Sequence, residues 1–374
     1  MDEVKSRLFS GTIFSFFKIT LMAFAMLIPT IYFSSLEISI VVYAFLLSIG
    51  DVFSFIMKPI VGALTDKHGE RRYMIIGGII FFVSLFLIGF TTDIVWLAIL
   101  KIIGGVSSAL VFVIIIIYSL RLVKDKPDSK VGFFTGLGNL GWVIGLFIPG
   151  LFVDSFGIQP AFYLIFAVGV LWIIFMFRFA KKKETKHSVR PSFSFLKKIP
   201  HLVILKSMDL AMFSAFLFFF TRYALQTLGL SGAVISSVVV AEVIIFALSN
   251  ILVGKISNKN RRKYWIPAGI IFHLLAATTM FFAFDLMHYY LVGVFIGLAG
   301  GFVDVWIFSN ISEKFESEEK GKVIGTFGWS YDFATILGAQ VPLIFILLNL
   351  GTFTALFVFP IVMLITFAVL KAKT

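Results

Sequence analysis

The sequence Gly62-Ala-Leu-Thr-Asp66-Lys-His-Gly69-Glu-Arg-Arg separates two long apolar segments of the chain. A short polar stretch in that position is expected to form a tight loop at a membrane face. Gly62 would let two helices pack closely, and Gly69 would supply the positive φ of a sharp reversal. Asp66 would lie against a helix N-terminus. The cations of the loop, which favour the cytoplasmic side of a membrane, are Lys67, Arg71 and Arg72.

The composition is that of a membrane protein. Hydrophobic residues make up 59% of the chain, charged residues make up 14%, and the mean hydropathy is +1.02. The net charge of +12 would suit a nucleic-acid-binding protein. We expect no nucleic-acid partner, however, because the cations lie in short segments between long apolar runs. The absence of cysteine excludes disulfides, thiolate catalysis and cysteine-ligated metals.

Twelve apolar segments are long enough to cross about 30 Å of hydrocarbon as helices. They lack the alternation over about ten residues that the strands of a membrane barrel would show. We therefore predict an all-α integral membrane protein with twelve transmembrane helices. The predicted segments are 9–33, 38–64, 73–91, 94–121, 132–153, 158–180, 204–227, 232–254, 264–284, 288–311, 322–348 and 352–370.

Lys and Arg residues gather on one side of this predicted arrangement. The two ends and every second inter-segment stretch hold 28 of the 32 Lys and Arg residues, with Lys206 counted among them, and the opposite loops hold none. The positive-inside rule then places both termini in the cytoplasm. The alternation also supports the number of spans, because one missed span would invert every later loop. We predict a multi-pass protein of the plasma membrane.

The loop quoted above resembles the signature between helices 2 and 3 of the major facilitator superfamily of transporters, which reads here Gly62-x-x-x-Asp66-Lys67-x-Gly69-x-Arg71-Arg72. A degenerate copy stands at the corresponding place in the second half of the chain, with Asn258 in place of the aspartate and without the second glycine. The resemblance implies two pseudo-symmetric six-helix bundles. We predict an N-terminal bundle at 1–180, a cytoplasmic linker at 181–203 and a C-terminal bundle at 204–374.

Two weaker patterns are similar to the same family. The fourth segment has Lys101 followed by Gly105, where the family has Arg-x-x-x-Gly. The fifth segment loosely resembles a glycine–proline pattern associated with antiporters, although Leu146 stands where that pattern has proline. Its matching residues are Gly132, Gly141, Gly145, Pro149 and Gly150. Glycines that allow close helix packing explain this spacing equally well, so the direction of transport stays open.

Charged residues inside the predicted spans are the main candidates for substrate binding. A charge near the bilayer centre costs about 2.5–3.5 kcal/mol on insertion scales, so such residues usually face protein or water. The resemblance implies that helices 1, 4, 7 and 10 line a central cavity, and each of these carries one candidate. We predict that the substrate is bound by Lys18, Lys101, Arg222 and Asp304. Lys101 and Arg222 could instead reach the outer interface or pair with carboxylates that close an outer gate.

Carboxylates inside the spans are candidates for proton coupling, namely Asp51, Glu242, Asp304 and Asp332. Glu242 could also be a neutral, hydrogen-bonded core residue. We expect Lys58 to extend to the cytoplasmic interface and Asp209 to be an interfacial or capping residue. The resemblance implies that the signature loop acts as a gate, through Gly62, Asp66, Lys67, Gly69, Arg71 and Arg72.

The excess of cations in the predicted cavity suits an anionic solute. We therefore predict a secondary active transporter that moves a small organic anion by alternating access and is coupled to protons. One alternative, suggested by the Phe-rich spans, is a proton-driven exporter of amphipathic or drug-like compounds. An alternative from another class is a non-transporting membrane receptor or scaffold.

An enzyme is not expected, because the sequence has no nucleotide-binding loop and no Ser-His-Asp arrangement. Its five histidines are scattered without metal-ligand spacing, so we expect neither a metal nor a cofactor. The expected partners are the lipid bilayer, a small-molecule substrate and protons, and we expect a monomer.

Overall fold

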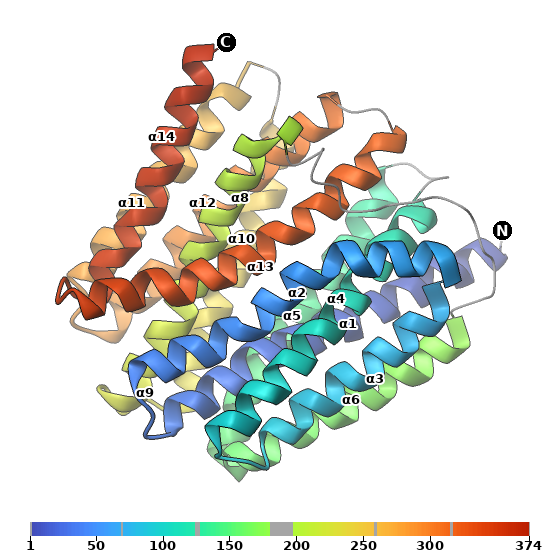
Figure 1. Ribbon diagram of the computed structural model, residues 1–374. Helices are drawn as coiled ribbons and strands as arrows, with labels where there is room; N and C mark the ends of the chain where they lie inside the picture. Colours follow the sequence, from blue (N-terminus) through green and yellow to red (C-terminus); the bar gives the residue numbers. More distant parts are fainter. Residues whose placement is uncertain are drawn as a thin grey trace. The chain divides into compact units, whose positions relative to one another are not determined.

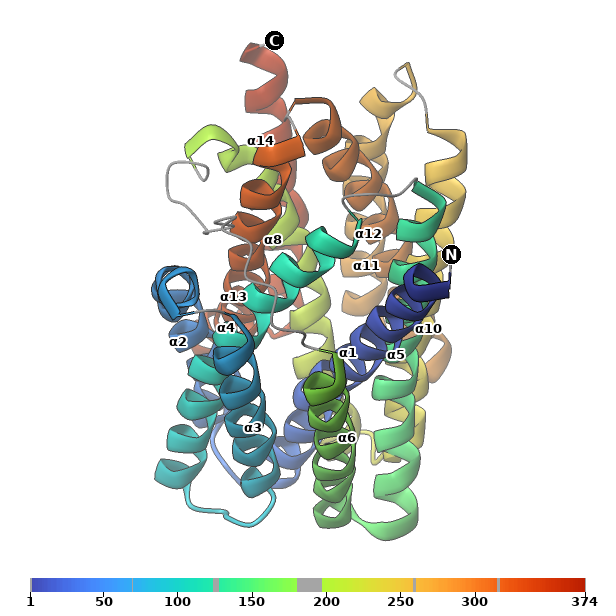
Figure 2. The same ribbon diagram turned by 90° about the vertical axis from the view of Figure 1, so that its right-hand side faces the viewer.

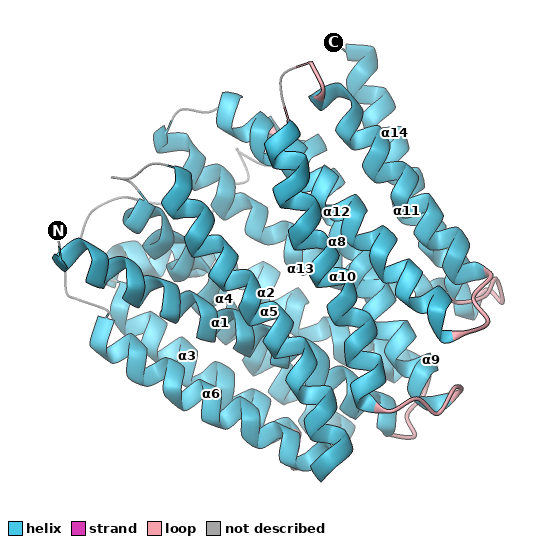
Figure 3. Ribbon diagram, turned by 180° about the vertical axis from the view of Figure 1, so that it is seen from behind, coloured by secondary structure: helices cyan, strands magenta, loops and turns pink. Residues whose placement is uncertain are grey.

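The computed structural model describes residues 2–68, 70–123, 128–179, 197–257, 260–314 and 317–373. All the regular secondary structure in these ranges is helical (Figure 3). Long apolar runs adopt helices in a membrane because only helices and closed barrels satisfy every backbone N–H and C=O group in lipid.

The first half of the chain contains six helices. They are α1 (Asp2–Ser35), α2 (Ile40–His68), α3 (Glu70–Ile88), α4 (Ile94–Val123), α5 (Asp128–Phe156) and α6 (Ile158–Phe179).

The second half contains several broken helices. The elements are α8 (Pro200–Ala215), η1 (Phe216–Phe220), α9 (Thr221–Gln226), α10 (Gly232–Ile256), η2 (Arg262–Tyr264), α11 (Trp265–Phe281), α12 (Leu286–Lys314), α13 (Ser317–Leu347), η3 (Phe353–Phe357) and α14 (Val358–Lys373).

The twelve predicted spans are confirmed. In the described part of the chain, ten helices, some formed from consecutive elements, are long and apolar enough to cross a membrane, and two shorter apolar helices lie at Tyr73–Ile88 and Leu140–Phe156. Several helices extend beyond the predicted ends. The largest difference concerns the signature stretch, because α2 continues to His68 and α3 begins at Glu70, so most of the predicted loop is helical.

The described residues form two compact units. Unit 1 contains Met1–Glu37, Ile49–Pro191 and Ser231–Ser236, and unit 2 contains Ile38–Ser48, Ser192–Leu230 and Ser237–Thr374. The predicted division at 181–203 stays a prediction, because most of that segment lies outside the described residues.

Glycines bring the helices of unit 1 together. In this unit α1 packs on α5 and α6, and α3 packs on α4, which lies beside it in Figure 2. A Cβ atom placed on Gly105 of α4 would lie within contact of the Gly50 carbonyl oxygen of α2 and clash with it, and one placed on Gly145 of α5 would lie 2.5 Å from Ala23 Cβ. These close approaches are the packing role expected of small residues in membrane helices.

In unit 2, α8 packs on α13, α12 and α14, and α11 packs on both α12 and α14 (Figure 1). The helix that begins as α8 changes to a π-helical turn at Phe216–Phe220 and returns to α-helix as α9. All five residues of this turn are buried. Tyr43 donates a hydrogen bond to the Phe218 carbonyl oxygen at 2.7 Å. Single π-helical turns are frequent at functional sites.

Candidate functional site

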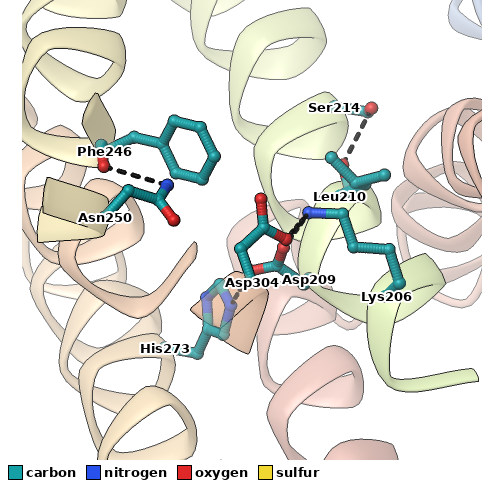
Figure 4. Close-up of polar contacts among 8 residues, drawn as sticks. All are labelled: Lys206, Asp209, Leu210, Ser214, Phe246, Asn250, His273 and Asp304. Atoms are coloured by element: carbon teal, nitrogen blue, oxygen red, sulfur yellow. Dashed lines mark hydrogen bonds and ion pairs between the residues drawn. The ribbon is translucent and has the colours of Figure 1, made fainter. Parts of the chain in front are cut away.

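A buried network of four charged or titratable side chains lies in unit 2. The Lys206 Nζ atom lies 2.9 Å from Asp209 Oδ2 and 2.5 Å from Asp304 Oδ1. His273 Nε2 lies 3.0 Å from Asp209 Oδ1. Figure 4 shows these side chains converging from three helices. We call Lys206, Asp209, His273 and Asp304 the charge network.

Helix geometry explains how the network is assembled. Lys206 and Asp209 are three residues apart on α8, a spacing that puts two side chains on the same helix face. His273 comes from α11 and Asp304 from α12, and these two helices pack on each other. One turn before Asp304, a Cβ atom on Gly300 would lie 2.9 Å from the Phe246 ring. That glycine therefore gives the ring of Phe246 room beside the network.

The phenyl ring of Phe246 closes one side of the network. Its centroid lies 5.9 Å from Lys206 Nζ, within the range of a cation–π interaction. All four network side chains are buried. Protein groups, rather than water, therefore surround most of these charged side chains.

The charges of the network do not cancel completely. One ammonium faces two carboxylates, which gives a net charge of −1 when the imidazole is neutral, and one bound proton would remove it. Asp209 contacts both Lys206 and His273, whereas the described contacts of Asp304 come from Lys206 alone. Because hydrogen bonds to the ionised form hold a carboxylate in that form, Asp304 is the better placed of the two to accept the proton.

The structure corrects two sequence interpretations. Lys206 was counted with the cytoplasmic cations, and Asp209 was expected at an interface, but both are buried in the network with Asp304. His273 was not predicted as a site residue. The signal available in the sequence was the Lys206–Asp209 spacing on the first apolar turns of the seventh span.

Arg222 lies away from the network. Its Nη2 atom donates a hydrogen bond to the Ile38 carbonyl oxygen at 2.8 Å, and its guanidinium carbon lies 4.7 Å from the centre of the Tyr43 ring. A second contact of unit 2 also reaches α2, because the Gln340 side-chain amide donates a hydrogen bond to Ser48 Oγ at 2.8 Å. The described contacts therefore bring Arg222 together with the start of α2 rather than with Asp304.

The other predicted substrate-binding residues lie in unit 1. Lys18 of α1 and Lys58 of α2 are close enough for their charges to act on each other, and Asp51 acts on Lys101 in the same way. Lys58 was expected to reach the cytoplasmic interface, but it is only 1% exposed. It is therefore another buried cation of this unit, and the interpretation as an interfacial residue is wrong.

The remaining predicted residues are placed as follows. Glu242 on α10 and Asp332 on α13 are both buried, outside the described contacts of the charge network. Gly69 lies outside the described residues, and so do the side chains of the other signature residues, Gly62, Asp66, Lys67, Arg71 and Arg72. Among the described residues, no group of three or more His, Cys, Asp and Glu could hold a metal ion.

In the described residues, ten helices able to span a membrane and two shorter apolar helices, with titratable side chains buried among them, define a multi-span membrane protein. The chain belongs to the major facilitator superfamily, whose family model matches residues 8–339. The resemblance of the signature stretch is thereby confirmed at the level of the family.

Three known proteins illustrate the relationship. The multi-drug resistance efflux pump PmrA of Streptococcus pneumoniae is 28% identical over 134 residues, which are 35% of this chain and 34% of PmrA. The proton-coupled antiporter flippase LtaA of Staphylococcus saprophyticus is 23% identical over 335 residues, 86% of this chain and 81% of LtaA. The chain spans about a third of the length of the first curated relatives that it matches.

A solved structure, that of the nucleoside transporter NupG, superposes with a TM-score of 0.74. The superposition covers 98% of each chain at 12% sequence identity. At this identity the similarity establishes the fold alone.

Proposed function

We propose that this chain is a proton-coupled exporter of amphipathic compounds, with the charge network of unit 2 as its proton site. The observation that carries the proposal is the burial of Lys206 between two carboxylates at 2.9 and 2.5 Å. The names of the relatives, a multi-drug efflux pump and a proton-coupled flippase, support export and proton coupling. We also propose a plasma-membrane location, cytoplasmic termini and a monomer.

The net charge of the network provides a physical basis for coupling. With both aspartates ionised the network carries −1, and burying that charge is unfavourable. A bound proton neutralises the network, so the protonated form favours a state in which these side chains stay buried. Loss of the proton favours a state in which water reaches them. A carrier that alternates between two such states exchanges protons with each side in turn.

The proton site is tested with the purified protein in liposomes under an imposed pH gradient, with the internal pH as the readout. Cationic dyes and organic anions are added in turn. Asp304→Asn is expected to abolish substrate-dependent proton movement, because the amide cannot bind a proton at neutral pH. The matched control is Asp285→Asn, which changes an exposed aspartate just before α12. Proton movement at the wild-type rate in Asp304→Asn would exclude this proton site.

An organic anion is the second candidate substrate. It is favoured by three lysines in the membrane spans of unit 1, Lys18, Lys58 and Lys101, of which Lys101 lies close enough to Asp51 for their charges to interact. The same liposomes distinguish the two candidates. Proton movement that depends on anions and disappears in Lys18→Gln would establish the anion carrier. Proton movement that depends on dyes and survives in Lys18→Gln would establish the exporter.

A further inference from the structure

Glu242 of α10 is a buried carboxyl group outside the charge network. It is 6% exposed, and the described residues give its carboxyl group neither a hydrogen bond nor an ion pair. Its backbone packs against α12, because a Cβ atom on Gly293 would lie 3.5 Å from Glu242 Cβ and one on Gly297 would lie 2.5 Å from the Glu242 carbonyl oxygen. Two glycines thus hold the start of this side chain against α12.

Residues close to Glu242 on α10 and α12 connect it to the charge network. Phe246, one turn further along α10, has its ring against both Gly300 and the ammonium of Lys206. Gly297, which touches the Glu242 backbone, precedes Asp304 by seven residues, or about 10 Å of helix rise. The charges of Asp209 and Lys206 are the ones that act on Glu242.

The two sites are staggered along the same pair of helices. Glu242 lies ten residues, about 15 Å, after the first residue of α10, and Asp304 lies ten residues before the last residue of α12. On the Gly232 side of Glu242, Ser237 and Tyr290 are hydrogen-bonded at 2.6 Å and join α10 to α12. One polar contact between α10 and α12 therefore lies on that side of Glu242.

We propose that Glu242 is a second proton-binding site, which receives a proton from the Gly232 end of α10 and passes it to the charge network. This role rests on the proposed proton coupling. A carboxylate without a hydrogen-bond donor or counter-ion is poorly solvated in the protein interior, whereas the neutral acid needs neither. Transfer moves one proton from the Glu242 carboxyl to a network carboxylate and leaves Glu242 ionised. Among the described contacts none joins Glu242 directly to a network carboxylate, so the transfer requires a water molecule or a side-chain movement.

The proton on Glu242 can be observed without a substrate. Infrared spectra of the purified protein in lipid nanodiscs, recorded across pH in H₂O and D₂O, report the C=O stretch of protonated carboxyl groups. We expect a titrating, deuterium-sensitive band that is lost in Glu242→Gln and kept in Asp304→Asn. In Asp209→Asn the pH midpoint of that band should shift, because a charge that acts on Glu242 has been removed. A spectrum that Glu242→Gln leaves unchanged, or a Glu242 band that never titrates, would overturn the proposal.

Transport measurements separate this proposal from the proposed function. In liposomes, Glu242→Gln should slow substrate-dependent proton movement by about a hundredfold or more, the scale on which losing a proton-transfer group slows a reaction. Glu242→Asp should recover part of the rate, and the control Asp285→Asn should leave it unchanged. Coupling that survives in Asp304→Asn would remove the proposed function. Wild-type coupling in Glu242→Gln, with coupling lost in Asp304→Asn, would remove the role of Glu242 alone.

Discussion

Unit 2 contains two aspartate–histidine pairs that differ in burial. His273 and Asp209 lie 3.0 Å apart, with their side chains 0% and 4% exposed. His288 and Asp285 lie 2.5 Å apart, with their side chains 26% and 50% exposed. The first pair joins α11 to α8 within the charge network, whereas the second lies at the start of α12, where Asp285 also accepts a hydrogen bond from the His288 backbone N–H at 3.0 Å.

The comparison separates the effect of residue type from the effect of surroundings. The exposed pair is a helix cap, and solvent screens it, so removing one partner lets water take its place. In the buried pair water has no such access, and each charge depends on its protein neighbours. A proton-coupling site must be buried in the same way as the pair of His273 and Asp209. Only at a buried site does a change of protonation alter the stability of a conformation.

The largest loss of stability is expected from removing Lys206, the cation of the charge network. Lys206→Met keeps a side chain of similar length but leaves Asp209 and Asp304 facing each other with a net charge of −2. Breaking one partner of a buried ion pair costs about 3–5 kcal/mol. The midpoint of thermal unfolding in detergent should fall strongly. The double variant Lys206→Met with Asp304→Asn restores the wild-type net charge and should recover most of the loss; a double variant less stable than the single one would contradict this account.

A smaller loss is expected from the histidine of the buried pair. His273→Ala removes a hydrogen bond to a charged group and leaves a cavity between α11 and α8, together worth about 2–4 kcal/mol. Asp209 keeps its contact with Lys206, so the loss should be smaller than in Lys206→Met. Thermal unfolding of His273→Ala and His273→Gln tests this, because the glutamine amide can donate in place of Nε2. Equal losses in the two variants would show that packing, rather than the hydrogen bond, stabilises this region.

The hydrogen bond from Tyr43 is buried but neutral, so its removal tests the effect of burial on stability without the effect of charge. Tyr43→Phe removes the hydroxyl that donates to the Phe218 carbonyl oxygen, which also accepts from the Thr221 backbone N–H. A neutral bond of this kind contributes about 1 kcal/mol. The ring that faces Arg222 remains in the variant. The unfolding midpoint should therefore fall less than in His273→Ala; a fall as large as in Lys206→Met would mean that this contact is linked to the charge network.

Most of the fold could be predicted from the sequence, because the length and spacing of apolar runs directly reflect the thickness of a bilayer. Helix ends were less predictable. The stretch from Gly62 to His68 was expected to be a loop, yet α2 continues through it, since polar residues past the hydrocarbon can extend a helix at no cost in burial.

The candidate site could be predicted only in part. Asp304 was identified because an aspartate deep in an apolar run is costly. Lys206 and Asp209 lie near the end of a run, where a long cation usually reaches the interface. Their pairing with His273 and Asp304 depends on how α8, α11 and α12 pack, over a separation of nearly a hundred residues. No local pattern in the sequence carries that information.

The smallest effect is expected at the exposed pair. His288 holds the pKa of Asp285 below its usual range, through a hydrogen bond from its side chain and a second from its backbone N–H. A lowered pKa in the folded protein stabilises it at pH values above the ordinary aspartate pKa of about 3.9, and this contribution is lost as the pH falls below that value. His288→Ala keeps the backbone donor, and solvent can hydrate the carboxylate. The unfolding midpoint of His288→Ala should equal that of the wild type between pH 5 and pH 8. Histidine side chains ordinarily change charge within this range, so the measurement would reveal any effect of the imidazole charge on stability. A fall comparable to that of His273→Ala would show that burial does not distinguish the two pairs.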